Sequence, residues 1–329
     1  MTKKLLDVRG LNVKFLTQGK SLHAVRGIDF SIFEGETLGI VGESGCGKSA
    51  TAKALVQLNP RYSSELSGEI LYQGNNLLTY SEKKMQLIRG KEIGMIFQDP
   101  MTSLNPTIKI GHQIMEGYLR HYPNASRKVA RQIALETLEK VGISHPEERF
   151  ESYPHTFSGG MRQRAMIALA LACKPHILLA DEPTTALDVT IQAQILDLLK
   201  QIQKETKTSI LLITHDLSVV AKMCDRVIIM YAGKIAEQGN VDDIFEAPQH
   251  PYTQRLLLSI PRLNQSKNEP LFTIEGTPPN LSYPLAGCAF CARCHHAMRI
   301  CANHQPPLFE TRPNHFTACF NHDPRLKND

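Results

Sequence analysis

Long hydrophobic runs are absent from this chain of 329 residues. No apolar stretch reaches the roughly 18–20 residues that a helix needs to cross a bilayer, and the opening MTKKLLDVRG develops no apolar signal-peptide core. A strong excess of one charge is also lacking, since the formal net charge is only +5 and the basic residues are scattered. We therefore expect a cytosolic chain that binds no nucleic acid and that only a partner would hold at a membrane.

The composition is that of a soluble globular protein, with 42% hydrophobic and 21% charged residues. Cysteines are distributed unevenly, because three lie singly and five gather near the C-terminus. The single ones are Cys46, Cys173 and Cys224, and the clustered ones are Cys288, Cys291, Cys294, Cys301 and Cys319. In a reducing compartment such a cluster indicates metal ligation rather than disulfides.

Three short apolar runs predict buried strands that end in reactive groups. Residues 37–42 lead into a glycine-rich loop and a helix from about Lys48, residues 176–181 end on Asp181, and residues 209–215 end on His215. Strand and helix alternation predicts an α/β fold with a parallel sheet and chemistry at the carboxyl ends of the strands. The helix between the last two strands is indicated by apolar positions at helical spacing, namely Ile191, Ile195, Leu198, Leu199 and Ile202.

The remaining segments show other sequence patterns. Residues 226–239 predict a hairpin that turns at Ala232-Gly233. Residues from about 100 to 160 predict a helical subdomain, with a serine cap and an amphipathic pattern at 126–142. After residue 240 prolines recur, so we expect one large domain at 1–240 and a separate, loop-rich C-terminal segment at 241–329 with little apolar content of its own.

The segment GESGCGKS (42–49) fits the pattern G-x-x-x-x-G-K-[ST] and stands between a predicted strand and a predicted helix. Its backbone N–H groups and the helix N-terminus would face phosphates. Lys48 would reach the β- and γ-phosphates, and Ser49 would ligate Mg²⁺. A flexible glycine turn is the alternative, which order and context disfavour. The predicted ATP-binding residues are Gly42, Glu43, Ser44, Gly45, Cys46, Gly47, Lys48, Ser49 and Ala50.

An acidic pair in HILLADEP (176–183) complements this loop. Asp181 would hold Mg²⁺ directly or through water. Glu182 would act as the general base for the water that attacks the γ-phosphate. By itself the pair would be read as a solvated helix start, but the glycine-lysine loop favours the catalytic interpretation.

A second anion-binding element is indicated by FSGGMRQRAM (157–166), in which a serine and two glycines open a helix that runs through Leu171. In this order the motifs resemble those of the ATP-binding subunits of ABC transporters, over about residues 5–240. Phe157 and Met161 stand where the commonest signature has leucine and glutamine or glutamate. The resemblance implies a P-loop NTPase of the ABC type, with a RecA-like core, an antiparallel β subdomain and a helical subdomain, followed here by a cysteine-rich extension.

The resemblance also implies individual roles. Gln98 matches the glutamine of the Q-loop, Asp188 lies in the D-loop (residues 186–188), His215 matches the switch histidine, and Phe15 is the residue expected to stack on adenine. The implied catalytic residues are Lys48, Gln98, Glu182 and His215, and the implied Mg²⁺ ligands are Ser49, Gln98 and Asp181. The signature residues Ser158, Gly159, Gly160 and Met161 would contact the nucleotide held by another subunit.

The implied partners follow from two phosphate-binding elements that serve different nucleotides. Two ATPase chains, identical or paralogous, would pack head to tail with ATP between them. The γ-phosphate would hold the interface between the two chains closed, and hydrolysis would let it open. The pair would dock on two transmembrane permease subunits near Gln98 and DPMTSLNP (99–106). An extracytoplasmic substrate-binding protein would be an indirect partner, and the chain would lie peripherally on the cytoplasmic face of the inner membrane.

Beyond residue 240, residues 247–263 and 287–301 resemble the ATPases of bacterial oligopeptide, dipeptide and nickel importers. There the resemblance implies a [4Fe–4S] cluster on Cys288, Cys294, Cys301 and Cys319, with Cys291 as a possible substitute. The residues alone leave three accounts open: an iron–sulfur cluster, which we favour, zinc, or no metal. A metal here would be structural. Zinc would draw on thiolates and on His295, His296, His304 and His315.

The function expected is that of an ATPase that energises di- or oligopeptide import. Nickel or antimicrobial-peptide uptake are alternatives, because the cargo need not touch this chain. A soluble ABC ATPase acting on nucleic acid or ribosomes is disfavoured, since each motif occurs once and no long coiled coil is inserted. A non-catalytic module is disfavoured by the intact set of Lys48, Asp181, Glu182 and His215.

Overall fold

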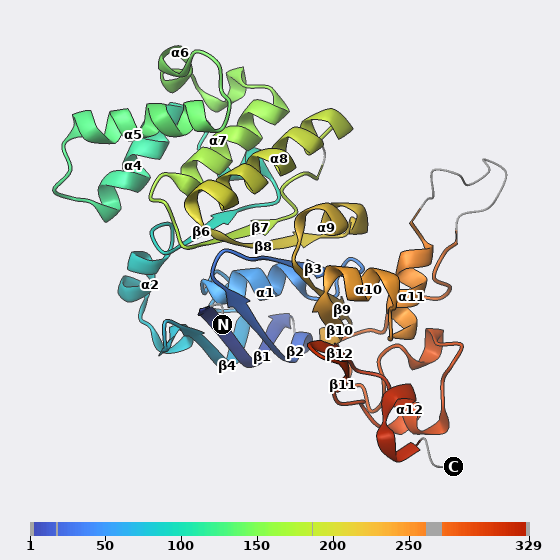
Figure 1. Ribbon diagram of the computed structural model, residues 1–329. Coiled ribbons are helices and arrows are strands. Elements are labelled where there is room, and N and C mark those ends of the chain that lie inside the picture. Colours follow the sequence, from blue (N-terminus) through green and yellow to red (C-terminus); the bar gives the residue numbers. More distant parts are fainter. Residues whose placement is uncertain (1–2, 18, 186, 261–271, 327–329) are drawn as a thin grey trace. The chain divides into compact units, whose positions relative to one another are not determined.

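The computed structural model describes residues 3–17, 19–185, 187–260 and 272–326 (Figure 1). The chain divides into two compact units. The first unit comprises Met1–Lys3, Phe33–Glu36 and Thr79–Ile213, and the second comprises Lys4–Ile32, Thr37–Leu78 and Thr214–Asp329. Within the described ranges, no helix has the length and apolar character that a membrane crossing demands. The expected division at residue 240 stays a prediction.

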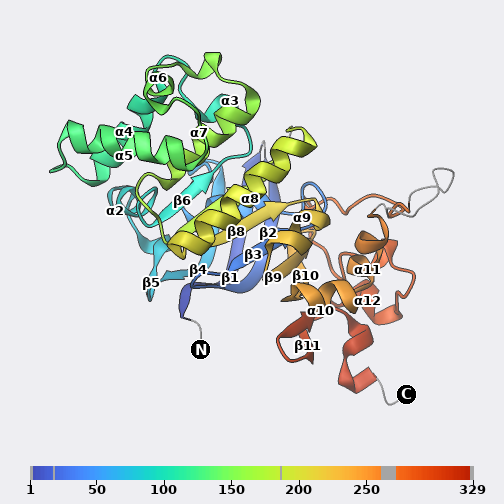
Figure 2. The same ribbon diagram turned by 45° about the horizontal axis from the view of Figure 1, so that its top comes forward.

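Three parallel strands form the sheet of the first unit, in the order β6 (Ile93–Ile96), β7 (Ile177–Asp181) and β8 (Ser209–Thr214). Every residue of β7 and β8 is buried, as expected for strands covered on both faces. Helix α8 (Val189–Thr206) lies along these strands in both views (Figures 1 and 2). It buries four of the positions predicted from helical spacing: Ile195, Leu198, Leu199 and Ile202.

The predicted helical subdomain is confirmed in the first unit, where residues 100–160 contain no strand. Figure 2 shows its helices gathered together. Ser126 caps α5, because its Oγ accepts from the Val129 N–H at 3.2 Å. Gly111 lets α4 approach Phe150, since a Cβ added there would lie 2.0 Å from the ring. The helices of this unit besides α8 are α2 (Glu82–Ile88), α3 (Pro100–Ser103), α4 (Ile110–His121), α5 (Arg127–Lys140), α6 (Pro146–Phe150) and α7 (Gly159–Leu171).

An antiparallel sheet of the second unit has the strand order β2-β1-β4-β5. Strands β1 and β4 pair with Leu6 opposite Tyr72 and Phe15 opposite Ser64. This sheet confirms the antiparallel β subdomain that the resemblance implied. Its strands are β1 (Lys4–Thr17), β2 (Lys20–Phe33), β4 (Ser64–Tyr72) and β5 (Asn75–Asn76).

The other strands of the second unit follow the order β11-β12-β10-β9-β3. Strand β3 (Thr37–Val41) runs parallel to β9 (Arg226–Tyr231), and β9 forms the predicted hairpin with β10 (Lys234–Asn240). The helices of this unit are α1 (Lys48–Leu55), α9 (Leu217–Met223), α10 (Val241–Glu246), α11 (Pro251–Leu258) and α12 (Arg299–Asn303).

The C-terminal segment is more ordered than the loop-rich expectation. Strand β12 (His315–Thr317) pairs antiparallel with β10, and β11 (Phe309–Arg312) pairs with β12. Both strands are too short to show a sequence period. The segment also has apolar content of its own, because Tyr252, Leu281 and Phe290 join a buried cluster with residues of β9.

A buried polar pair also fastens this segment. His315 on β12 and Glu237 on β10 are both fully buried, and His315 Nε2 lies 2.7 Å from Glu237 Oε1. The Glu237 carboxylate also accepts from the backbone N–H groups of Gln249 and His250, at 2.6 and 3.0 Å. Burial raises the pKa of Glu237, but these hydrogen bonds outweigh it, so the pKa lies below the usual value and the carboxylate is ionised.

Candidate functional site: an ATP-binding loop and its catalytic elements

The phosphate loop joins β3 to α1 in the second unit. Gly47 has φ 106°, and a Cβ there would lie 2.4 Å from the Ala24 carbonyl oxygen. A Cβ on Gly42 would lie 2.1 Å from the Met230 carbonyl oxygen. Only glycine fits at these two positions, because the neighbouring backbone approaches too closely for any side chain. Ser44 and Gly45 at the tip of the loop are exposed.

Lys48 begins helix α1 and is buried. Its Nζ donates to the carbonyl oxygens of Gly42 and Glu43, at 2.7 and 3.1 Å. The ammonium group is therefore held inside the curl of the loop, where a phosphate would meet it. Cys46 is also buried, and burial raises the pKa of its thiol, so its side chain is neutral. Ser49 and Ala50 follow in the first turn of α1 and are half-buried.

Two residues from the C-terminal segment reach this loop. Tyr252, on α11, accepts through its hydroxyl oxygen from the backbone N–H of Glu43 at 3.0 Å. Arg293, in the 3₁₀ turn Cys291–Arg293, donates to both carboxylate oxygens of Glu43, at 2.7 and 3.0 Å. Sequence reasoning missed both residues. Tyr252 lies in the segment 247–263 and Arg293 lies among the clustered cysteines, and no sequence pattern links either residue to residue 43.

Phe15 and His215 also belong to the second unit. Phe15 is half-buried near the end of β1, and its stacking on adenine stays a prediction. His215 is exposed directly after β8, and Asp216 then caps α9 by accepting from the Ser218 N–H at 2.8 Å. The backbone thus turns into a helix just after His215, which holds this residue at a strand end as predicted.

The acidic pair lies in the first unit, at the end of β7. Asp181 is only 2% exposed. Glu182 has a left-handed φ of 48°, and its N–H donates to the Ile213 carbonyl oxygen at 2.9 Å. A left-handed glutamate is strained, and such strain is typical of functional sites.

The structure brings Gln98 and Glu182 together. Glu182 Oε2 accepts from Gln98 Nε2 at 3.1 Å and from Thr185 Oγ1 at 2.9 Å. Gln98 follows β6 and Glu182 follows β7, and these strands are parallel neighbours. The hydrogen bonds hold the Glu182 carboxylate in one position, as a general base requires. Lys48, Ser49 and His215 lie in the other unit.

The signature residues open helix α7 in the first unit. Ser158 and Gly159 are exposed, and Ser158 Oγ accepts from the Met161 N–H at 3.3 Å. Phe157 is buried, so it fills an apolar position as the commoner leucine would. A Cβ on Gly160 would lie 3.0 Å from a methyl carbon of Ile191. The exposed N-terminus of this helix carries partial positive charge and suits a phosphate.

The D-loop residue Asp188 caps helix α8. Its Oδ1 accepts from the Ile191 N–H at 2.9 Å, and Asp188 is exposed. Ala186, which begins the D-loop, lies outside the described residues, as does part of the predicted segment 247–263.

All five clustered cysteines are described, and none forms a disulfide. Burial above all, and negative charge on the neighbouring cysteines next, raise the pKa values of Cys288 and Cys319 to about 11. Cys301 Sγ accepts from the Met298 N–H at 3.4 Å. In the described part of the chain, no three or more His, Cys, Asp or Glu residues are arranged to hold a metal ion. The arrangement therefore does not support the expected iron–sulfur or zinc site, and His315 binds Glu237 instead.

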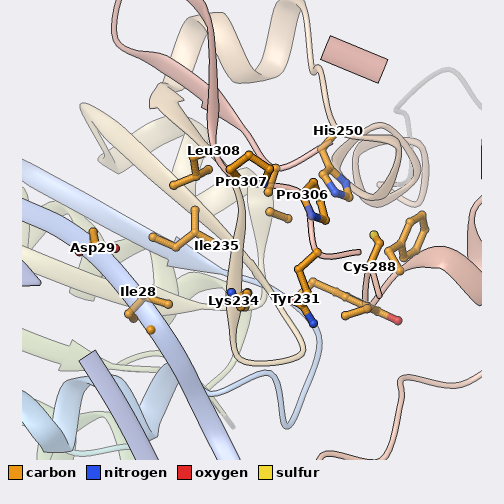
Figure 3. Close-up of a pocket in the computed structure, with 16 residues that line it drawn as sticks. Ile28, Asp29, Tyr231, Lys234, Ile235, His250, Cys288, Pro306, Pro307 and Leu308 are labelled. Carbon is orange, nitrogen blue, oxygen red and sulfur yellow. The ribbon is translucent and has the colours of Figure 1, made fainter. Parts of the chain in front are cut away.

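A cavity of about 180 Å³ lies beside the cysteine segment (Figure 3). Cys288, His250 and Tyr231 line it together with Ile28 and Asp29 of β2. Its walls are mostly apolar side chains and prolines, and its lining includes no residue of the phosphate loop at 42–49.

Two family profiles match the chain. The one described as "ABC transporter" covers residues 25–185, and the one described as "Oligopeptide/dipeptide transporter, C-terminal region" covers residues 236–301. The oligopeptide transport ATP-binding protein OppD of Bacillus subtilis is 54% identical over 95% of this chain and 87% of its own length. The dipeptide transport ATP-binding protein DppD of the same organism is 52% identical over 99% and 97%, respectively.

Solved structures agree on the fold. A dimeric post-hydrolysis structure of the ATP-binding cassette MJ0796 with ADP and Pi is 27% identical, with a TM-score of 0.65 over 72% of this chain and 98% of that one. The structure of cbiO1 from Clostridium perfringens is 29% identical, with a TM-score of 0.64 over 74% of this chain and 92% of that one. The chain therefore belongs to the ATP-binding proteins of ABC transporters and is an ABC-type ATPase. Within that family it groups with the oligopeptide and dipeptide transport ATP-binding proteins.

Proposed function

We propose that this chain binds and hydrolyses ATP to energise the import of dipeptides or oligopeptides across the cytoplasmic membrane. The observation that carries the proposal is the similarity to OppD and DppD along nearly the whole chain, including the C-terminal region at 236–301. Nickel and antimicrobial peptides are the alternative cargoes.

The proposed chemistry divides among few side chains. Lys48 binds the β- and γ-phosphates, and His215 contacts the γ-phosphate. Mg²⁺, held by Ser49, Asp181 and Gln98, would neutralise charge on the phosphates. Glu182 accepts the proton of the attacking water, and the hydrogen bonds from Gln98 and Thr185 support this role because they fix its carboxylate.

The proposed assembly is a head-to-tail pair of ATPase chains, identical or paralogous, on two transmembrane permease subunits. The exposed Ser158 and Gly159 at the start of α7 support the pairing, because they leave a helix N-terminus available to a nucleotide held by another chain. The chain would lie peripherally at the cytoplasmic face of the inner membrane and would cooperate with an extracytoplasmic substrate-binding protein.

A metal at the C-terminal thiols is a separate proposal, with a [4Fe–4S] cluster on Cys288, Cys294, Cys301 and Cys319 as the first candidate and zinc as the second. Its support is the sequence resemblance at residues 287–301 and the crowding of five cysteines between residues 288 and 319; the arrangement of the described thiols adds none. Anaerobic purification with an absorbance spectrum and iron and zinc analysis tests it. One equivalent of zinc without iron would exclude the cluster, and absence of both metals would exclude either site.

The test of the catalytic assignment is Glu182→Gln, which keeps the size of the side chain and one acceptor oxygen but removes the base. We expect unchanged ATP binding and a turnover lowered by about 10²–10⁴-fold, the range for loss of a general base. Glu116→Gln, at an exposed position on α4, is the matched control and should hydrolyse ATP like the wild type. Retained hydrolysis in Glu182→Gln would remove Glu182 from this role.

A further inference from the structure

Glu43, the second residue of the phosphate loop, has every polar group engaged within the second unit. Its N–H donates to the Tyr252 hydroxyl at 3.0 Å. Its carbonyl oxygen accepts from Lys48 Nζ at 3.1 Å and from the Cys46 N–H at 3.3 Å. Its carboxylate accepts from Arg293. The conformation of the loop at residue 43 is therefore fixed by the C-terminal segment as well as by the loop itself.

Arg293 uses all five of its N–H donors in this arrangement. Two bond the Glu43 carboxylate, at 2.7 and 3.0 Å, and one bonds the Tyr231 hydroxyl at 3.1 Å. The other two bond the carbonyl oxygens of Ile274 and Glu275, at 3.0 and 2.9 Å. The Arg293 side chain is only 5% exposed, against 24% for Glu43. A lysine could not reproduce this set, because it lacks the planar fork that binds both carboxylate oxygens at once.

Tyr252 contacts the loop from a rigid position. It is fully buried, and its ring centroid lies 4.6 Å from that of Tyr231 and 5.4 Å from that of Phe290. Such packing restricts the ring and holds the hydroxyl at the Glu43 N–H. Tyr231 thus contacts both Tyr252 and Arg293, which joins the two contacts into one cluster.

Glu43 also poses an electrostatic problem, because a carboxylate in a phosphate loop repels the triphosphate. The guanidinium group of Arg293, which bonds both carboxylate oxygens, neutralises that charge and holds the Glu43 side chain in one rotamer. We propose that Arg293, together with Tyr252, is a positioning residue for nucleotide binding, which holds and neutralises Glu43 so that the C-terminal segment sets the ATP affinity of the loop. This inference rests on the proposed function of residues 42–49 as the ATP site.

The test is a thermodynamic cycle on the full chain, with the Kd of the fluorescent analogue mant-ATP and Mg²⁺ as the readout. Arg293→Gln should weaken binding about tenfold, equivalent to about 1.4 kcal/mol, while kcat at saturating ATP stays within about twofold. Glu43→Gln removes the repelling charge, so Glu43→Gln/Arg293→Gln should bind no more weakly than Glu43→Gln alone. The Arg293→Gln defect should shrink at high salt, which screens the exposed edge of the carboxylate.

Matched variants separate this inference from the proposed function. Arg299→Gln, at an exposed position on α12, should bind as the wild type. Lys48→Ala should lose binding, and if it does not, the assignment of the loop fails together with the inference. If Lys48→Ala loses binding while Arg293→Gln keeps wild-type affinity, or if the two defects simply add in the double variant, the inference alone is overturned. Should Arg293→Gln fail to fold, Tyr252→Phe carries the test, with an expected threefold loss and wild-type affinity as the contrary result.

Discussion

His250 provides a sharp test of how the C-terminal segment is fastened. The residue stands directly before α11, is 4% exposed, and accepts from the Tyr252 N–H through Nδ1 at 3.0 Å. Burial lowers the pKa of this imidazole to about 4, against 6.5 for an unperturbed histidine. The folded protein therefore keeps His250 neutral in a pH range where the unfolded chain protonates it.

The sign and size of the effect follow from proton linkage. Between pH 6.5 and about 4 the unfolded chain binds a proton at this position that the folded chain does not, so acid favours unfolding. The full difference corresponds to roughly 3 kcal/mol, and about 2 kcal/mol of it is lost by pH 5. Stability contributed by this site is complete above pH 6.5 and decreases as the pH falls toward 4.

The perturbation is His250→Asn, which cannot titrate and keeps an oxygen that caps the helix. Urea unfolding followed by circular dichroism at pH 7.5 and pH 5, with hydrogen exchange on peptides covering 226–258, gives the free energy of unfolding for both proteins. The wild type should lose about 2 kcal/mol more than the variant between the two pH values. Other histidines cancel in this difference, so equal losses would refute the assignment.

Two further substitutions test packing and charge elsewhere. Gly111→Ala places a methyl group where the Phe150 ring stands, so α4 and α6 must separate. The free energy of unfolding of the first unit should fall by about 1–3 kcal/mol in urea, and an unchanged midpoint would contradict this packing. Glu237→Gln replaces one acceptor with a donor opposite buried N–H groups and removes the charge beside His315, so unfolding should be easier by about 2–4 kcal/mol at pH 7. The loss should be smaller at pH 4, because the unfolded wild-type chain takes up a proton there while the folded carboxylate, whose pKa is lowered, resists protonation, so the wild type itself has lost stability. A loss that is independent of pH would argue against an ionised Glu237.

The sequence predicted the parts of the fold that depend on local pattern. Strands β3, β7 and β8 are continuous apolar runs, which buried parallel strands require, and α8 follows from its helical spacing. The pairing of Gln98 with Glu182 was also within reach, because each follows a strand of the same parallel sheet. The alternation of strands and helices along the chain predicts a parallel sheet, and in a parallel sheet the carboxyl ends of neighbouring strands lie side by side at one edge.

Contacts between distant segments could not be predicted. The β11–β12 hairpin is too short for its period to show, and its pairing with β10 depends on where the chain returns. Arg293 lies between two of the clustered cysteines, and nothing near residue 43 signals an arginine 250 positions away. The family resemblance implied a set of four cysteine ligands, whereas the arrangement of the thiols is decided by packing and backbone hydrogen bonds that the sequence does not reveal.

The ion pair between residues 43 and 293 has a consequence for how this protein is made. A ribosome finishes the phosphate loop long before it reaches the arginine that braces it, so every growing chain passes through a stage with a complete motif and no brace. Contacts of such sequence separation form late, after the loop between them has closed. A chain that ends before residue 293 would thus contain the whole phosphate loop but lack the arginine that holds Glu43, and it should bind ATP more weakly than the full chain.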